Sequence, residues 1–192
     1  MTSFSSNWFD NLAKDNFENI IKPFFTSKDI KYLEIGCYEG ASLHYMFTNI
    51  MNTNSTATVI DPFIFYDTQL QTFTNNMENY KDRIELIVGY SQTELRKLNR
   101  NNYDFIYIDG DHTSDGVFTD AILSLPLLKN GGIIIFDDYL WRHNGSHTIT
   151  SLDDINLLHP NNPFSGINKF LELYKDYIEI IESNWQMVIR KL

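Results

Sequence analysis

Two short apolar segments of this chain are each followed by a pair of carboxylates. Asp109 and Asp111 come after the first segment, and Asp137 and Asp138 come directly after the second. Continuous apolar runs rich in β-branched and aromatic residues are typical of buried strands in a parallel sheet. If a helix crosses between these strands, their carboxyl ends lie at one edge of the sheet, where open α/β proteins bind ligands. Four carboxylates gathered there raise one another's pKa values unless a cation lies among them. The sequence therefore predicts a metal site.

A histidine stands beside this acidic group. His112 follows Asp109 by three residues, within reach of an oxygen held near the carboxylates. A neutral imidazole accepts a proton near pH 7, so His112 is a candidate general base; capping of a helix that begins near Ser114 is the alternative. Asp111 is either a partner of His112 or the solvated end of the strand. Oxygen ligands without a Cys–His cluster favour Mg²⁺, with Mn²⁺ or Ca²⁺ as alternatives.

The elements that must position these residues alternate along the chain. Apolar spacing predicts helices over 8–25, 41–49, within 68–80, over 92–98 and 115–128, and from Pro163 to Tyr174. Apolar runs predict strands over 31–35, 57–60, 84–88, 105–108 and 133–136, and a closing hairpin of 177–181 and 186–189. This alternation predicts an α/β fold: a Rossmann-like doubly wound sheet of five parallel strands plus an antiparallel C-terminal hairpin, with helices on both faces.

A second candidate site follows the first predicted strand. The segment Glu34-Ile35-Gly36-Cys37-Tyr38-Glu39-Gly40-Ala41-Ser42 places two glycines in a strand-to-helix turn. Gly36 permits a tight turn and close approach of the backbone to a ligand, and Gly40 lets the next helix pack near the strand. The spacing differs from the G-x-G-x-x-G of dinucleotide enzymes, and an ordinary turn is the alternative interpretation.

Two further segments agree with a nucleotide-like ligand. Asp61 ends the second strand 21 residues after Gly40, about where an acidic residue accepts hydrogen bonds from ribose hydroxyls. Because Asp61 precedes a proline, a solvated helix cap is the alternative. Ser91 and Gln92 follow the third strand and would meet an adenine edge, although Ser91 also suits a helix N-cap.

With these motifs in this order, the chain resembles the class I S-adenosylmethionine-dependent methyltransferases. Glu34-x-Gly36-x-x-x-Gly40 is similar to their first motif, Asp61 to their ribose-binding acid, and Leu128-Lys129-Asn130-Gly131-Gly132 to the turn before their fifth strand. Gly89-Tyr90-Ser91-Gln92 and the two acidic strand ends more narrowly resemble metal-dependent O-methyltransferases of the catechol and macrolide-sugar types. The resemblance covers about 32–139.

This resemblance implies the donor S-adenosylmethionine, bound by Glu34, Gly36, Gly40, Ser42, Asp61, Ser91, Gln92 and Asp109. It also implies a divalent cation, usually magnesium, held by Asp109, Asp137 and Asp138. Asp109 and His112 are then the catalytic residues. Catechol-type relatives carry a lysine where this chain has His112, whereas sugar-type relatives carry a histidine. The acceptor implied is therefore a hydroxyl of a small molecule, preferably a sugar or glycan.

Two other functions remain open at this point. One is metal-independent methyl transfer to nitrogen or nucleic acid, with the acids serving as hydrogen-bond acceptors. The net charge of −10 argues against nucleic acid as the substrate, because binding to the phosphate backbone requires basic patches. The other is a non-catalytic protein that binds the donor without using it.

Composition and the N-terminal sequence predict the domain count and the location of the protein. A length of 192 residues predicts one domain, and no apolar run approaches the length of a membrane span. A single cysteine, Cys37, and no recognisable secretory signal predict a reducing, cytoplasmic location. Cys37 and His44 are predicted to be structural. The N-terminal segment 1–30 is expected to cover the donor or to form a homodimer contact.

A polar and aromatic loop is predicted over 139–162, directly after the second acidic pair. It would close over the acceptor, with Trp141 stacking on a sugar face and Arg142 or His143 hydrogen-bonding to it; a surface loop is the alternative.

Overall fold

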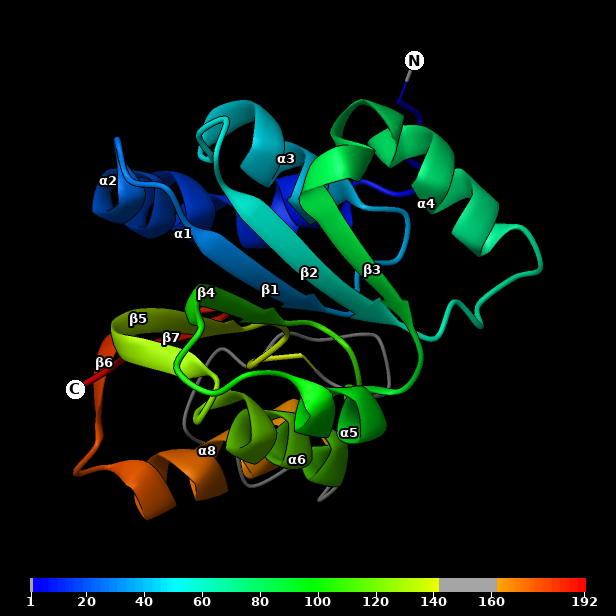
Figure 1. Ribbon diagram of the computed structural model, residues 1–192. Helices are drawn as coiled ribbons and strands as arrows, with labels where there is room; N and C mark the ends of the chain where they lie inside the picture. Colours follow the sequence, from blue (N-terminus) through cyan, green and yellow to red (C-terminus); the bar gives the residue numbers. More distant parts are fainter. Residues whose placement is uncertain (1, 142–161) are drawn as a thin grey trace.

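A seven-stranded sheet in the order β3-β2-β1-β4-β5-β7-β6 forms the centre of the computed structural model, which describes residues 2–141 and 162–192 (Figure 1). The strands are β1 Lys31–Ile35, β2 Thr56–Asp61, β3 Ile84–Val88, β4 Tyr103–Ile108, β5 Leu128–Phe136, β6 Ile178–Ser183 and β7 Met187–Lys191. The first five run parallel, while β7 lies antiparallel to β5 and β6 antiparallel to β7. The predicted fold class is confirmed.

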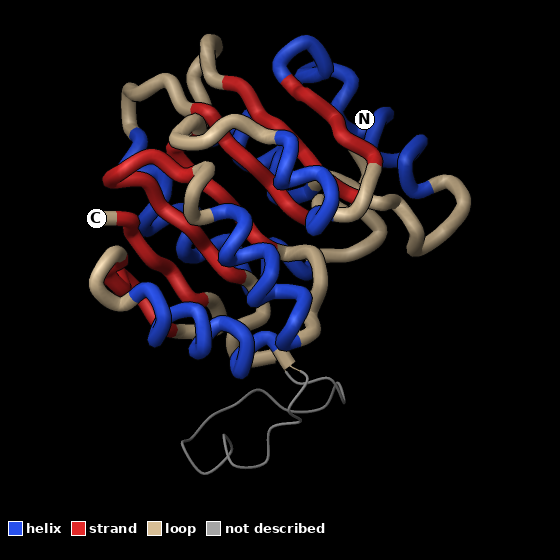
Figure 2. Tube along the Cα trace, turned by 60° about the horizontal axis from the view of Figure 1, so that its bottom comes forward, coloured by secondary structure: helices blue, strands red, loops and turns tan. Residues whose placement is uncertain are grey.

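Helices cover both faces of the sheet, as Figures 1 and 2 show. One layer holds the N-terminal helix, α3 Ala41–Asn49, α4 Gln69–Met77 and a 3₁₀ turn Glu78–Arg83. The other holds α5 Ser91–Glu94 with a 3₁₀ turn Leu95–Lys97, α6 Ser114–Ser124 and α8 Pro163–Tyr174. Each layer closes its own apolar core against the sheet, because strands flanked by helices on both sides bury both faces.

The N-terminal helix contains two wide turns. It consists of π-helical Phe9–Ala13, α1 Lys14–Asn16, π-helical Phe17–Ile21 and α2 Lys22–Phe25. Phe17 and Ile21 are fully buried, and the Phe17 ring lies edge-on to Tyr107 of β4 at 5.1 Å between centroids. The helix is therefore part of the core of the sheet, and its span agrees with the predicted 8–25.

One predicted boundary was wrong. Helix α6 ends at Ser124 instead of continuing to Leu128, and Leu128 already pairs with Tyr103 of β4. Pro126 has no N–H to continue the helical ladder, so the chain turns there and the Leu127 N–H donates to the Ser124 carbonyl. The glycine-containing segment 128–132 is thus the irregular start of β5 rather than a turn before it.

Two further predictions, one about a membrane span and one about the acceptor loop, can be compared with this fold. No helix among the described residues is long and apolar enough to cross a bilayer. Trp141 is the last described residue of the predicted acceptor loop, and Arg142 and His143 lie outside the described residues.

Candidate functional site

The carboxyl ends of β1, β4 and β5 meet at one edge of the sheet. The Asp109 N–H donates to the Ile35 carbonyl at 2.8 Å, and the Asp137 N–H donates to the Ile108 carbonyl at 2.9 Å. The parallel pairing thus extends one residue past each strand and brings Asp109 and Asp137 beside each other. The convergence predicted from the two apolar segments is confirmed.

We call Asp109, Asp137 and Asp138 at this edge the acid cluster. The negative charges of their carboxylates repel one another. Burial raises the pKa of Asp109 well above its usual value, and the charges of Asp137 and Asp138 raise it further. Burial and the Asp138 charge raise the pKa of Asp137 to about 6. A cation placed among these carboxylates would remove the repulsion, because an opposite charge favours the ionised form.

The geometry of the cluster suits a small cation. Ligand atoms of Asp109, His112 and Asp138 lie within 4.8 Å of one another. The predicted third ligand, Asp137, stands next to Asp109 but directs one oxygen elsewhere, because its Oδ1 accepts a hydrogen bond from Gln186 Nε2 at 2.8 Å. His112 therefore lies close enough to contact either a cation at the cluster or a group bound beside it, and Asp137 has a partner that sequence patterns did not indicate.

His112 is held by the acid cluster. Its Nδ1 lies 2.8 Å from Asp138 Oδ2. Burial lowers the pKa of His112, but the hydrogen bond and charge of Asp138 outweigh it, so the pKa is raised. Asp138 itself has a φ of 53°, a left-handed conformation that costs energy for a non-glycine residue and is typical of functional sites. The Trp141 ring lies 5.5 Å from the imidazole between centroids.

The alternative role of His112 as a helix cap does not fit. The N-cap of α6 is Thr113, whose hydroxyl accepts a hydrogen bond from the Gly116 N–H at 3.1 Å. Asp111 is exposed and its carboxylate accepts the Thr113 N–H at 2.9 Å, and its charge also helps to raise the pKa of His112.

Gly36 joins the glycine turn to the acid cluster. Its φ is +80°, and a Cβ on this residue would lie 2.2 Å from the Asp109 carbonyl oxygen. Only glycine allows the turn to pass this close to the end of β4. Gly40, with a φ of +90°, faces the Phe73 and Met77 side chains of α4. The tight turn predicted at Gly36 is present, but the neighbours of these glycines are the end of β4 and the side chains of α4; the predicted approach of a ligand to Gly36 stays a prediction.

Two other residues that are predicted to bind the methyl donor, Glu34 and Asp61, form hydrogen bonds that stabilise the glycine turn. Glu34 is fully buried and accepts a hydrogen bond from the Ser42 hydroxyl, while burial raises its pKa to about 8. Asp61 is also buried; its Oδ2 accepts the Cys37 and Tyr38 N–H groups at 2.9 and 3.0 Å. Its Oδ1 accepts the Phe63 N–H at 2.6 Å. The Asp61 carboxylate is thus bound by the glycine turn at Oδ2 and by the segment after β2 at Oδ1.

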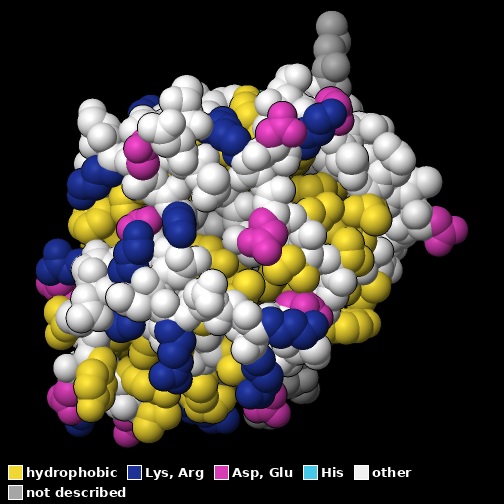
Figure 3. All heavy atoms as spheres, viewed as in Figure 1, with side chains coloured by type: hydrophobic (Ala, Val, Ile, Leu, Met, Phe, Trp, Pro, Cys, Tyr) yellow, Lys and Arg dark blue, Asp and Glu magenta, His cyan; other side chains and the backbone are white. Residues whose placement is uncertain are grey.

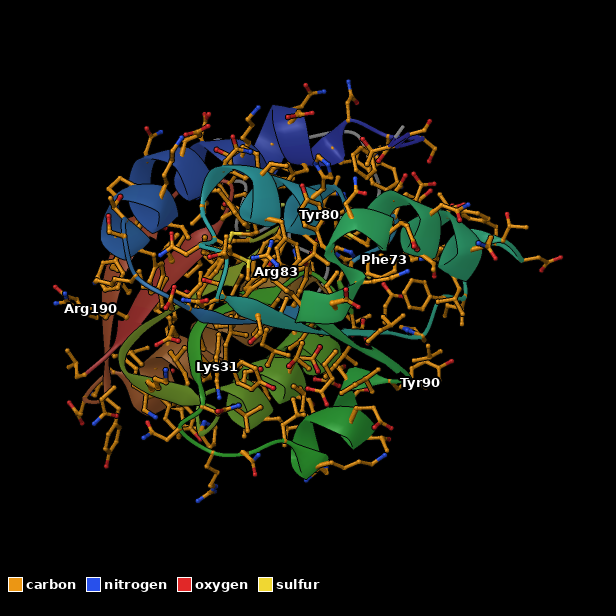
Figure 4. All side chains as sticks on the ribbon, turned by 45° about the horizontal axis from the view of Figure 1, so that its top comes forward. Lys31, Phe73, Tyr80, Arg83, Tyr90 and Arg190 are labelled. Carbon is orange, nitrogen blue, oxygen red and sulfur yellow. The ribbon has the colours of Figure 1, made fainter. Side chains whose placement is uncertain are left out.

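The remaining predicted residues are placed as follows. Ser91 and Gln92 form the first turn of α5 and are half-buried, beside Tyr90, which lies at the end of β3 and is 59% exposed (Figure 4). Cys37 is buried with its thiol pKa raised by burial, and His44 packs edge-on against Phe4 and Tyr80. These last two residues fit the structural roles predicted for them.

Sequence reasoning missed two buried acids. Glu39 accepts the Ser5 N–H at 2.6 Å and the Tyr66 hydroxyl at 2.6 Å, which ties the N-terminal residues to the glycine turn. Asp120 on α6 is fully buried, and neither of its oxygens has a partner in good geometry among the described residues. Burial raises its pKa to about 7, and the nearby Ser91 hydroxyl lowers it slightly. Position inside the glycine segment was the only signal for Glu39, and Asp120 had none.

An aromatic rim surrounds the glycine turn. Trp8 and Phe65 lie 5.4 and 5.6 Å from the Tyr38 ring and are 63% and 74% exposed. Figure 3 shows hydrophobic side chains gathered on the side of the molecule where β3 and α4 lie. Trp8 begins the N-terminal helix, so the first turn of that helix lies beside the predicted donor turn while the rest of it packs on the sheet.

Comparisons with known proteins agree with this geometry. A family model described as "Methyltransferase domain" matches residues 33–139. The chain is 30% identical over 147 residues to a probable caffeoyl-CoA O-methyltransferase 3 of Dictyostelium discoideum, covering 73% of this chain and 56% of that protein. It is 32% identical over 121 residues to an uncharacterized protein of Acanthamoeba polyphaga mimivirus, covering 60% and 54% respectively. The chain spans about half the length of the curated relatives it matches.

A solved structure shares the fold. An O-methyltransferase of Bacillus cereus, crystallised in complex with SAH, superposes with a TM-score of 0.62 at 17% identity, covering 96% of this chain and 95% of that one. At this identity the likeness concerns the fold alone.

Proposed function

Because the chain belongs to the family of methyltransferase domains, we propose that it transfers a methyl group from S-adenosylmethionine to a hydroxyl oxygen of a small molecule, with a divalent cation bound at the acid cluster. The observation that carries the proposal is the grouping of Asp109, His112 and Asp138 ligand atoms within 4.8 Å, one strand away from the glycine turn. The probable O-methyltransferase from Dictyostelium supports oxygen as the methylated atom.

The donor would lie across the carboxyl ends of β1, β2 and β3. Gly36 and Gly40 open the turn to it, and Glu34 and Ser42 hold that turn from beneath. Ribose hydroxyls would compete with backbone N–H groups for Asp61, and Ser91 and Gln92 would meet the adenine edge. Because the backbone of Asp109 lies against Gly36, a donor bound at the turn would lie next to the acid cluster. The SAH complex of the Bacillus cereus neighbour supports this choice of donor.

The cation would be Mg²⁺, or Mn²⁺, held by carboxylates of Asp109, Asp137 and Asp138, because oxygen ligands suit these ions. When bound, such a cation lowers the pKa of an adjacent hydroxyl and fixes the position of its oxygen. The mutual repulsion of the acid cluster supports this assignment.

His112 would act as the general base. With Nδ1–H donated to Asp138, the imidazole keeps Nε2 free to accept a proton. As the acceptor O–H proton passes to Nε2, the oxygen forms a bond to the methyl carbon and the carbon–sulfur bond breaks. The sulfonium becomes a neutral thioether. A histidine base and Trp141 beside it favour a sugar or glycan hydroxyl as acceptor, because an indole ring can stack on a sugar face.

Transfer of a radiolabelled methyl group to a panel of sugars, catechols and caffeoyl-CoA tests this function. We expect transfer with Mg²⁺, loss of activity in EDTA and recovery when Mg²⁺ is added in excess. Asp109→Asn and His112→Ala should each lower kcat by at least about 100-fold. The histidine variant should still bind the donor in a calorimeter. His44→Ala, a histidine outside the site, is the matched control and should keep its activity.

Each of these measurements has an outcome that contradicts one part of the proposed function. Full activity in EDTA would contradict the cation, and an unchanged kcat in His112→Ala would contradict the base. Methylation of nitrogen or of RNA in place of a hydroxyl would replace the proposed acceptor, and donor binding with no transfer to any acceptor would favour a non-catalytic protein.

A further inference from the structure

A buried glutamine connects the acid cluster to the C-terminal hairpin. Gln186 precedes β7 and is fully buried. Its Nε2 donates to Asp137 Oδ1 at 2.8 Å, and its Oε1 accepts a hydrogen bond from Asn16 Nδ2 at 2.8 Å. Both ends of this amide are thus occupied, one by a carboxylate of the cluster and one by the N-terminal helix.

The orientation of both amides follows from chemistry. An ionised carboxylate only accepts hydrogen bonds, so Gln186 must present its NH₂ to Asp137 and its carbonyl oxygen to Asn16. Asn16 must then present its NH₂ to Gln186, which agrees with its own oxygen accepting Asn184 Nδ2 at 3.2 Å. The Asn16 NH₂ also donates to Asn184 Oδ1 at 3.1 Å, so the two asparagine amides pair reciprocally while Asn16 holds the Gln186 carbonyl oxygen and Gln186 donates to Asp137.

The N-terminal helix contributes a buried polar residue, Asn16, to this contact. Asn16 is 6% exposed on a helix whose neighbouring inward residues, Phe17 and Ile21, are apolar. A buried amide costs free energy unless it is hydrogen-bonded, so Asn16 is a residue that packing alone does not explain. It lies in the short α1 segment between two π-helical stretches, and such wide turns occur frequently at functional sites.

The hairpin holds the glutamine from the other side. The Gln186 N–H donates to Asn184 Oδ1 at 2.9 Å, and the Asn184 N–H donates to the Gln186 carbonyl at 2.9 Å. The Gln186 backbone is therefore fixed by the turn and its side chain by Asn16. A side chain held at both ends can fix the rotation of the carboxylate that it binds.

We propose that Gln186, oriented by Asn16, is a positioning residue that fixes the Asp137 carboxylate for cation binding. The inference rests on the proposed function, because it takes the acid cluster as the cation site. Gln186 binds Oδ1 of Asp137, and the Tyr107 hydroxyl also hydrogen-bonds to this carboxylate, which lies beside Asp109. Cation affinity then depends on a residue of the N-terminal helix far from the site in sequence.

Direct binding of Mn²⁺, followed by electron paramagnetic resonance, tests this role without any turnover. Gln186→Met keeps the side-chain length and removes the donor; we expect the Kd for Mn²⁺ to rise by about 10-fold or more. Asn16→Asp is the sharper variant, because an acceptor at position 16 draws the Gln186 NH₂ away and turns its oxygen toward Asp137. The Kd should rise at least as much, although Gln186 is unchanged.

Asn76→Leu is the matched control. Asn76 is 5% exposed, and its amide bonds to Ser3 and the Glu39 carbonyl, so it ties the N-terminal segment down away from the acid cluster. Thermal unfolding of every variant identifies those that fold. We expect Asn76→Leu to lose stability while its Kd for Mn²⁺ stays unchanged. Asn16→Leu, which removes the partner without adding a charge, should raise the Kd several-fold and serves if Gln186→Met does not fold.

The outcomes separate this inference from the proposed function. Wild-type protein that binds Mn²⁺, with unchanged affinity in folded Gln186→Met and Asn16→Asp, overturns the positioning role and leaves the cation site intact. A Kd that rises equally in Asn76→Leu also overturns it, because loss of stability alone would then explain the effect. Wild-type protein that binds no Mn²⁺ contradicts the proposed cation site itself, and the positioning role with it.

Discussion

Asp61 and Glu39 at the glycine turn differ from Asp109 and Asp137 of the acid cluster in the hydrogen-bond donors around them. Glu34, beneath the turn, is an exception, because burial raises its pKa to about 8. At the glycine turn, Asp61 accepts three backbone N–H groups. Burial raises the pKa of Glu39, but hydrogen bonds from Tyr66 and Ser5 outweigh it and lower the pKa overall. At the acid cluster, burial and neighbouring carboxylates raise the pKa of both Asp109 and Asp137.

The difference separates acids whose charge is already stabilised by N–H and hydroxyl groups of the chain from acids that lack such partners. Carboxylates that are supplied with donors hold the chain together and need no cation. Carboxylates that face one another lack such compensation, so a cation stabilises their ionised form. Sequence position placed Asp61, Asp109 and Asp137 alike, at the ends of strands, and the hydrogen-bond partners in the structure separate them.

The largest expected effect comes from breaking the contact between the two regions. Gly36→Ala places a Cβ 2.2 Å from the Asp109 carbonyl oxygen at a φ of +80°. We expect a loss of about 4 kcal/mol in the free energy of unfolding, from clash and left-handed strain together. Gly131→Ala is the control, because its φ is +78° but nothing lies within 4 Å of the added Cβ. It should lose only about 1–2 kcal/mol. Equal losses in urea denaturation would show that the close contact is unimportant.

Added cation should stabilise the protein in a pH-dependent manner. Mg²⁺ at 100 times its Kd adds about 2.7 kcal/mol to the free energy of unfolding if it binds only the folded state. Asp137, whose pKa is raised to about 6, is mostly protonated at pH 5 and ionised by pH 8, and the pKa of Asp109 is also raised by burial and by the charges of Asp137 and Asp138. The shift in Tm on adding Mg²⁺ should therefore be larger at pH 8 than at pH 5. A shift that is equal at both pH values would argue against binding at these carboxyls.

Neutralising one acid from each region should change stability in opposite directions. Asp61→Asn removes the charge that three N–H groups bind, and we expect a loss of about 2 kcal/mol. Asp109→Asn removes a repelled carboxylate, and at pH 8 without cation we expect a gain of about 1 kcal/mol. Urea denaturation of both variants in EDTA measures this. Losses of similar size in both would erase the distinction between the two regions.

The smallest effect concerns Asp120, a buried acid outside both regions. Its pKa is raised from 3.8 to about 7 by burial, so the folded state binds its proton more tightly than the unfolded state. Stability from this group is fully present below pH 4 and is lost as the pH rises through 7. The loss grows between pH 4 and pH 7, so we expect Asp120→Asn to gain stability relative to wild type, and the gain should be larger at pH 8 than at pH 5. A gain that does not depend on pH would contradict the assignment.

Much of the fold could be predicted because its signals are local. The apolar runs that form β4 and β5 are continuous in sequence, and the glycines of the turn follow β1 directly. The end of α6 was missed because apolar spacing continues past Ser124, whereas the missing N–H of Pro126 interrupts the ladder.

The partners of the site residues could not be predicted in the same way. Gln186 reaches Asp137 from 49 residues away, and Asn16 reaches Gln186 from 170 residues away. Such contacts depend on which faces of the sheet the hairpin and the N-terminal helix cover. The donors that occupy Asp61 are backbone groups, which every residue carries, so no residue type indicates them.

The most direct test of the central claim is a calorimetric titration of Mg²⁺ into three proteins at pH 8: wild type, Asp61→Asn and Asp109→Asn. If the acid cluster is the cation site and the glycine-turn acids are structural, wild type and Asp61→Asn bind one Mg²⁺ with similar affinity, and Asp109→Asn shows no saturable binding. Saturable binding that survives in Asp109→Asn would contradict the account, as would binding that is lost in a folded Asp61→Asn variant.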